Sequence, residues 1–178
     1  MRLIDAEALR AALPMPAAID ALEAAFRTGD PGAGPIRSHV ETPSGSVLTM
    51  PATGLAGTGI KLVTVTPANP DRGLPLIHGA YILFGPSTQE VEAVIDGGAL
   101  TAVRTGAVSG LATRYLARPD ASSLLIFGAG VQARSHLEAM RAVRPIDRVS
   151  VVSRSMRSAE ALVDEVSGDG PQVRVGSA

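Results

Sequence analysis

The spacing of apolar positions at the start of the chain predicts one short strand followed by two helices. The pair at 3–4 predicts a short strand, and Asp5 is placed to cap a helix over residues 6–13. Apolar residues then recur three and four positions apart, which predicts a second helix ending at Gly29.

Residues 37–95 carry a different pattern, in which short apolar or β-branched runs are separated by Gly, Pro or Asn. These runs predict strands at 46–50, 59–66, 79–84 and 91–95. Because no helical segment separates them, we expect an antiparallel or mixed sheet. A long helix is predicted from Asp96 or Gly97 to about Leu116, and its many small residues indicate that another segment packs closely against it.

The last third of the chain alternates strand and helix. The predicted elements are a strand at 124–127, a helix at 132–143, a strand at 149–152, a helix at 158–166 and a strand at 172–175. The first strand runs directly into Gly128-x-Gly130-x-x-Ala133, where a helix begins. This strand, turn and helix are typical of a dinucleotide-binding fold, in which Gly130 lets the backbone approach a pyrophosphate. A tight turn with no ligand is the alternative.

The predicted fold class is therefore α/β. An N-terminal α+β domain over 1–118 is followed by a partial Rossmann-like nucleotide-binding domain over 119–178, with Arg118-Pro119-Asp120 as the linker. A complete two-halved nucleotide domain has about six strands, and the sequence has room for about three. We therefore expect the chain to be truncated within this domain.

Composition narrows the function further. The net charge of -1 shows no basic block, so neither nucleic acid nor a membrane is an expected partner. The absence of cysteine excludes thiolate nucleophiles and Cys-ligated zinc. The acidic start resembles no signal peptide, and no apolar run is long enough for a membrane span, so a cytoplasmic protein is expected.

The second strand of this region ends in Ser153-Arg154-Ser155, with no acidic residue. An acid at this position binds the ribose 2′-hydroxyl of NAD, whereas an arginine favours the 2′-phosphate of NADP. Ser153 and Arg154 are therefore predicted cofactor residues, and NADP(H) is favoured over NAD(H). The alternative is that Arg154 is only solvated.

Three cations are candidates for binding an anionic substrate. Arg104 falls at helical spacing from Leu100 and Val108, which predicts a guanidinium on an apolar stripe that needs an anion or an internal carboxylate. Lys61, the one lysine among 16 basic residues, alternates with apolar residues on a strand face, although it could instead protect an exposed strand edge. Arg37 could be an ordinary surface residue. The three histidines show no metal-ligand spacing, and no metal site is predicted.

Four ordered motifs resemble the ornithine cyclodeaminase/mu-crystallin family. They are Gly59-Ile-Lys-Leu-Val-Thr-Val-Thr-Pro-Ala-Asn-Pro70, Gly73-Leu-Pro75, Leu100-Thr-Ala-Val-Arg-Thr-Gly-Ala107 and Gly128-Ala-Gly-Val-Gln-Ala133. The resemblance covers essentially the whole chain. It implies a substrate-binding and dimerisation domain followed by a Rossmann domain that binds NAD(P), in a homodimer.

The resemblance also implies an activity and residue roles. Family members, which include ornithine cyclodeaminases and ketimine reductases, transfer a hydride to or from a small α-amino or α-imino acid. By position, Arg37, Lys61 and Arg104 would bind the substrate carboxylate, with Lys61 also the catalytic residue near the reacting nitrogen. The implied cofactor residues are Arg104, Thr105, Gly128, Gly130, Val131 and Gln132. A non-catalytic nucleotide-binding protein and an inactive truncated remnant are the alternatives.

Overall fold

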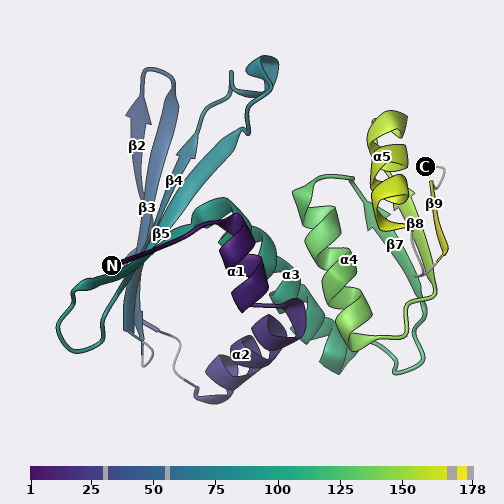
Figure 1. Ribbon diagram of the computed structural model, residues 1–178, viewed down its shortest axis with the longest axis horizontal. Helices are drawn as coiled ribbons and strands as arrows, with labels where there is room; N and C mark the ends of the chain where they lie inside the picture. Colours follow the sequence, from purple (N-terminus) through teal and green to yellow (C-terminus); the bar gives the residue numbers. More distant parts are fainter. Residues whose placement is uncertain (30–31, 55–56, 168–171, 176–178) are drawn as a thin grey trace. The chain divides into compact units, whose positions relative to one another are not determined.

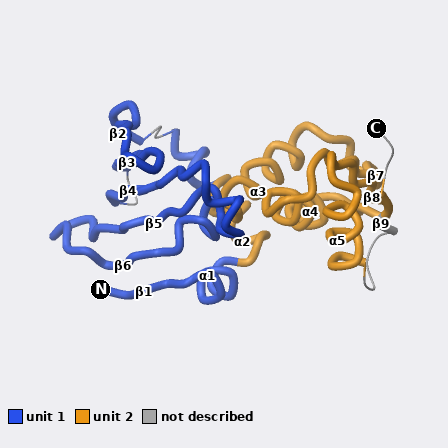
Figure 2. The backbone as a smooth tube through the Cα atoms, turned by 90° about the horizontal axis from the view of Figure 1, so that it is seen from above, with its two compact units in different colours: residues 1–13, 24–101 blue, residues 14–23, 102–178 orange. Residues whose placement is uncertain are grey.

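The computed structural model describes residues 1–29, 32–54, 57–167 and 172–175. The chain divides into two compact units (Figure 2). Unit 1 comprises Met1–Leu13 and Ala24–Thr101, and unit 2 comprises Pro14–Glu23 and Ala102–Ala178. The domain boundary expected after residue 118 stays a prediction.

Unit 1 is built on a six-stranded mixed sheet with the order β1-β6-β5-β4-β3-β2 (Figure 1). Its strands are β1 (Arg2–Ile4), β2 (Ser38–Thr42), β3 (Gly45–Gly54), β4 (Gly57–Val65), β5 (Ile77–Phe84) and β6 (Val91–Asp96). β1 runs parallel to β6, and the other neighbouring pairs are antiparallel, which confirms the predicted mixed sheet. A single 3-10 turn, η1 (Pro70–Arg72), lies between β4 and β5.

The strands are longer than their apolar runs predict, and β2 was not predicted as a separate strand. β3 continues beyond Met50 to Gly54 because it pairs with β4 along its whole length. Cross-strand pairing therefore recruits residues of weak strand propensity at the end of this hairpin. The helix α1 (Ala6–Ala12) follows β1, and the Asp5 carboxylate accepts a hydrogen bond from the Ala8 N–H at 2.8 Å, as predicted.

Unit 2 contains a three-stranded parallel sheet with the order β7-β8-β9. Its strands are β7 (Ser123–Phe127), β8 (Arg148–Val152) and β9 (Gln172–Val175), and they alternate with α4 (Val131–Val143) and α5 (Met156–Val166). This confirms the predicted βαβαβ order. The core between sheet and helices consists of Ile126, Ala133, Leu137, Val149, Val151, Ala159 and Leu162.

Two further helices, α2 (Met15–Arg27) and α3 (Gly97–Leu116), contribute residues to both units. Within unit 2, the small residues of α3 permit the close approach that the sequence predicts. A Cβ on Gly106 would lie 2.6 Å from the Ser135 carbonyl oxygen of α4, and one on Gly110 would lie 2.8 Å from Ile19 Cδ1 of α2. Larger residues at these two positions would push the three helices apart.

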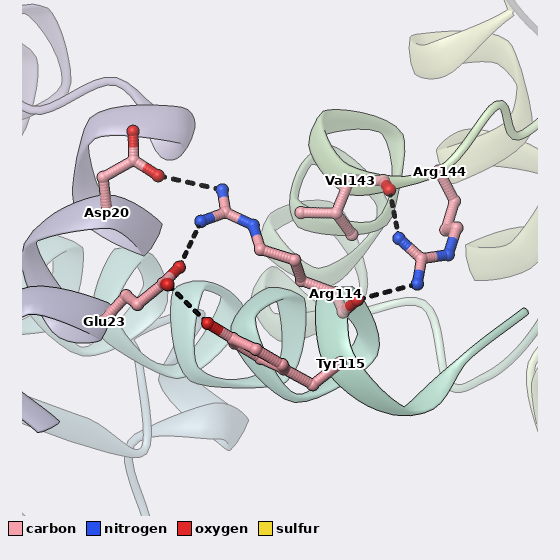
Figure 3. A network of polar contacts seen from close by, with 6 residues as sticks. All are labelled: Asp20, Glu23, Arg114, Tyr115, Val143 and Arg144. Carbon is pink, nitrogen blue, oxygen red and sulfur yellow. Dashed lines mark hydrogen bonds and ion pairs between the residues drawn. The ribbon is translucent and has the colours of Figure 1, made fainter. Parts of the chain in front are cut away.

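The carboxyl end of α3 is held by two arginines in unit 2 (Figure 3). Arg114 forms ion pairs with Asp20 at 2.9 Å and with Glu23 at 2.6 Å, and the Tyr115 hydroxyl donates a hydrogen bond to Glu23. Hydrogen bonds to these two carboxylates raise the pKa of Arg114 above its ordinary value. These contacts tie α3 to α2.

Arg144, which follows α4, caps the last carbonyl groups of α3. Its guanidinium donates hydrogen bonds to the Thr113, Arg114, Ala117 and Arg118 carbonyl oxygens at 2.6–2.9 Å. The Thr113 and Arg118 carbonyls also accept backbone hydrogen bonds, from the Ala117 and Ala121 N–H groups, so Arg144 supplies the side-chain donor for Arg114 and Ala117. A cation is also favoured at this end of the helix dipole. One side chain therefore satisfies the end of a helix that lies about 30 residues earlier in the chain.

Candidate functional site

The glycine turn follows β7 in a conformation that requires glycine. Gly128 has a φ of +101°, which L side chains rarely adopt, and its N–H donates a hydrogen bond to the Val152 carbonyl oxygen at 2.7 Å. Apart from the adjacent residues, no atom of the described part of the chain lies within 4 Å of the position that a Cβ would take on Gly128 or Gly130. The turn thus presents bare backbone to open space, as a bound pyrophosphate requires.

The helix α4 begins immediately after this turn with an uncapped N-terminus. Gly130 is its N-cap and supplies no side-chain hydrogen bond, while Val131 and Gln132 occupy the exposed first turn. Unpartnered N–H groups at a helix N-terminus, together with the helix dipole, favour an anion. The residues predicted to bind the pyrophosphate are therefore adjacent. Their open backbone and free helix N-terminus suit an anionic group of this kind.

Ser153 and Arg154 lie beside the glycine turn because β7 and β8 run parallel and the Gly128 N–H binds the last residue of β8. Arg154 is exposed, and its guanidinium has no ion pair or hydrogen bond within the described part of the chain. Ser153 is half-buried, and its hydroxyl accepts a weak hydrogen bond from the Ser155 N–H at 3.4 Å. An arginine is thus available at the position where a ribose substituent is recognised.

Arg104 does not lie on a buried stripe, so that prediction is wrong. The side chain is exposed, and Val108, one turn later, is 40% exposed. The buried apolar side chains of α3 are instead those of Ala99, Ala102, Val103, Ala107 and Leu111. No internal carboxylate pairs with Arg104 among the described residues, because its guanidinium faces solvent rather than a core.

Thr105, the neighbour of Arg104, has the opposite environment. Its Oγ1 is buried and has no hydrogen-bond partner among the residues that the structure describes. A buried hydroxyl without a partner is uncommon in folded proteins, and a ligand or water is the usual explanation. This observation fits the cofactor role that the family resemblance implies for Thr105.

Lys61 lies on β4, which has a strand on either side, so the alternative that it protects a sheet edge is wrong. It pairs with Met50 of β3 and Tyr81 of β5, and its side chain is half-buried on the face that carries buried Val63. Arg37 is exposed and precedes β2, where Ser38 pairs with Thr49. Continuing that register by one residue sets Arg37 opposite Met50 and on the face of Lys61.

The predicted site residues thus fall into three groups. Gly128, Gly130, Val131, Gln132, Ser153 and Arg154 gather at the carboxyl ends of β7 and β8 in unit 2. Arg37 and Lys61 share a face of the sheet in unit 1, whereas Arg104 and Thr105 lie on the part of α3 that belongs to unit 2.

The histidines have ordinary structural environments. His136 lies between the Gln132 carbonyl oxygen, at 2.7 Å from Nδ1, and the Ser109 hydroxyl, at 3.0 Å from Nε2, so it joins α3 to α4. His39 and His78 are exposed, and His39 lies 3.1 Å from Glu41. Within the described residues, no three His, Asp or Glu side chains are grouped as metal ligands, and no helix has the length and apolar character to cross a membrane.

A charged pair links the two helices that cover the parallel sheet. Arg134 of α4 donates hydrogen bonds from Nε to both carboxylate oxygens of Glu165 of α5, at 2.7 and 2.8 Å. These bonds lower the pKa of the Glu165 carboxyl and raise that of Arg134. Sequence reasoning missed both this pair and the Arg144 cap, because the partners are 26–31 residues apart and no local spacing signals them.

Comparison with known proteins identifies curated relatives of the chain. The chain is 42% identical over 123 residues to a Δ1-pyrroline-2-carboxylate reductase of Bacillus cereus, covering 68% of this chain and 38% of the relative. It is 35% identical over 163 residues to an alanine dehydrogenase of Archaeoglobus fulgidus, covering 90% of this chain and 51% of that protein. The chain thus spans about half or less of the length of these curated relatives.

Solved structures match the whole chain. The archaeal alanine dehydrogenase dimer with bound NAD superposes with a TM-score of 0.89 at 32% identity, covering 56% of that chain. The Δ1-pyrroline-2-carboxylate reductase of Thermococcus litoralis, in complex with NADH and L-proline, gives 0.90 at 33% identity and 57% coverage of that chain. The model of the ornithine cyclodeaminase/mu-crystallin family matches residues 3–178. The chain therefore belongs to the ornithine cyclodeaminase/mu-crystallin family.

Proposed function

We propose that the protein transfers a hydride between a nicotinamide dinucleotide and a small α-amino or α-imino acid. The observation that carries the proposal is the glycine turn. Gly128 at positive φ, open space at Gly128 and Gly130, and the uncapped start of α4 together form a pyrophosphate cradle. Proteins that match this part of the chain include an alanine dehydrogenase and a Δ1-pyrroline-2-carboxylate reductase.

The substrate carboxylate is assigned to Arg37 and Lys61, which share one face of the sheet in unit 1. A guanidinium donates two parallel hydrogen bonds to a carboxylate and fixes its plane, while an ammonium adds a compact charge. We assign Arg104 to the same anion on the family resemblance, and its exposed guanidinium is available for this role.

The chain's own residues position the reactants and hold one proton. A nicotinamide dinucleotide supplies the hydride chemistry when it is bound. Arg37 and Lys61 hold the carboxylate, so that the neighbouring carbon is presented in one orientation. Lys61 Nζ carries a proton that it shares with the substrate nitrogen, which makes an imine more electrophilic. The α4 N-terminus and Gly130 hold the pyrophosphate.

The dinucleotide is proposed to be NADP(H) in preference to NAD(H). Arg154 follows β8, no acid stands at this position, and the Gly128–Val152 hydrogen bond sets it beside the turn. We further propose that the protein acts as a homodimer in the cytoplasm, as the family resemblance implies.

The cradle is tested by Gly130→Val. Gly130 has a φ of -90° and free space around its Cβ position, so valine fits without backbone strain but fills the pyrophosphate site. We expect binding of NADPH and NADH to be lost in calorimetry, with an unchanged melting temperature. The control is Ser87→Val, which places the same side chain on an exposed turn of unit 1. Undiminished affinity in Gly130→Val contradicts the proposed site.

A further inference from the structure

Tyr81 stands directly opposite Lys61 in the sheet of unit 1. The two residues are register partners of the antiparallel β4–β5 pair, so both side chains rise from the same face. Tyr81 is half-buried. It therefore borders the surface to which Arg37 and Lys61 were assigned as carboxylate ligands.

The position of the Tyr81 ring is fixed by a glycine. Gly59 precedes Lys61 by two residues on the same strand face and is buried. A Cβ on Gly59 would overlap the Tyr81 hydroxyl and ring, with Cε1 at 2.9 Å. The hydroxyl end of the phenol thus lies over Gly59 of β4, in a space that exists only because residue 59 has no side chain.

The Tyr81 hydroxyl has no hydrogen-bond partner among the residues that the structure describes. A half-buried phenol usually finds an acceptor. A carboxylate offers about four lone-pair sites, and one ammonium and one guanidinium leave some of them free. A neutral donor that lies next to a cation and lacks a protein acceptor is suited to such an anion.

We propose that Tyr81 is a further substrate-binding residue, whose hydroxyl donates a hydrogen bond to the substrate carboxylate beside Lys61. The proposal rests on the proposed function, since it takes the anion site on this sheet face as given. It adds a role for Gly59, which keeps the phenol in place without touching the substrate.

The chain offers a direct probe, because it contains two tyrosines and no tryptophan. The protein is labelled with 3-fluorotyrosine, and Tyr115→Phe assigns the two fluorine resonances. L-proline and L-alanine are titrated with NADH present throughout. We expect the Tyr81 resonance to shift saturably, while that of Tyr115, which is bonded to Glu23 in unit 2, stays constant.

Affinity is then compared among variants. Tyr81→Phe keeps the ring and removes the hydroxyl, and we expect it to weaken binding by about tenfold, the effect of one hydrogen bond to a charged group. Gly59→Ala displaces the phenol and should weaken binding similarly with the hydroxyl still present. Lys61→Met should abolish binding.

The outcomes distinguish a failure of the Tyr81 proposal from a failure of the proposed function. If binding needs Lys61 but is unchanged in Tyr81→Phe, the tyrosine proposal is overturned and the proposed function stands. If binding persists in Lys61→Met, or the parent protein binds neither amino acid, the carboxylate site itself is wrong and both proposals fail.

Discussion

Arg154 is a single charge on which the proposed cofactor preference depends. Replacing it with aspartate removes a cation that would meet the 2′-phosphate of NADP and supplies an acceptor for the 2′-hydroxyl of NAD. We predict that the parent binds NADPH more tightly than NADH and that Arg154→Asp reverses the order, with a change of about tenfold or more for NADPH. Calorimetry measures both affinities.

The matched control for this substitution is Arg72→Asp, which makes the same charge change at an exposed site in unit 1. It should alter neither affinity. Equal affinities of the parent protein for the two dinucleotides would mean that Arg154 is only solvated.

The Glu165–Arg134 pair is expected to make the stability of unit 2 depend on pH. Its pKa is lowered in the folded state by hydrogen bonds from Arg134, so the pair stabilises the fold fully above the ordinary pKa of 4.5. That stabilisation is lost as the pH falls through the lowered pKa. Because the pair is half-exposed, we expect at most about 1 kcal/mol.

Urea unfolding at several pH values measures this contribution. The stability difference between the parent and Glu165→Gln should be present at neutral pH and shrink below about pH 4.5. A difference that stays constant across this range would show that the charge of Glu165 is not what matters.

Some residue environments could be predicted from the sequence, and others could not. The glycine turn could be predicted because strand, turn and helix are consecutive, and their physical requirements are local. The environment of Arg104 could not, because helical spacing gives the neighbours of a residue but not which face of the helix is buried. Tyr81 gave no local signal, since its partners Lys61 and Gly59 lie about 20 residues away.

At the scale of elements, the Arg144 cap is the contact with the largest expected effect on stability. Arg144→Leu removes the side-chain donor to the Arg114 and Ala117 carbonyl groups at the end of α3. We predict a loss of about 1–3 kcal/mol in the free energy of unfolding. Arg141→Leu, the same change at an exposed site in the last turn of α4, should cost less than about 0.5 kcal/mol. Equal effects in the two variants would rule out a special capping role.

Element types and order follow closely from periodicity, whereas element ends and pairing do not. Helices α4 and α5 begin within two residues of their predicted starts, since their apolar faces and first-turn residues are local features. The extension of β3 to Gly54 and the existence of β2 depend on pairing with neighbours. A strand whose end is fixed by its partner cannot be delimited from its own residues.

At the scale of the whole molecule, β7 is an edge strand that exposes large apolar side chains. It pairs with β8 alone among the described strands, and its Leu125 and Phe127 are 54% and 77% exposed. A hollow of about 380 Å³ lined by β7 and α4 lies beside it. Open apolar strands pair readily with other chains.

We therefore predict concentration-dependent association that Leu125→Lys suppresses, because a charged side chain on an edge strand disfavours pairing. Sedimentation velocity measures it. Val40→Lys provides the control, since Val40 is also exposed and lies on β2, an edge strand of the other sheet. If the parent protein is monomeric at all concentrations, the β7 edge does not mediate association.

The central claim is hydride transfer to or from a small amino or imino acid, and an isotope measurement tests it most directly. The protein is incubated with Δ1-pyrroline-2-carboxylate and with NADPH that carries deuterium at the reactive carbon of its nicotinamide ring. Mass spectrometry then locates deuterium in the product. The account predicts proline labelled at Cα by the parent protein and by Ser87→Val, and none by Gly130→Val. A parent protein that binds NADPH but yields no labelled proline or other labelled amino acid from related imino acids would contradict the claim and leave a non-catalytic nucleotide-binding protein.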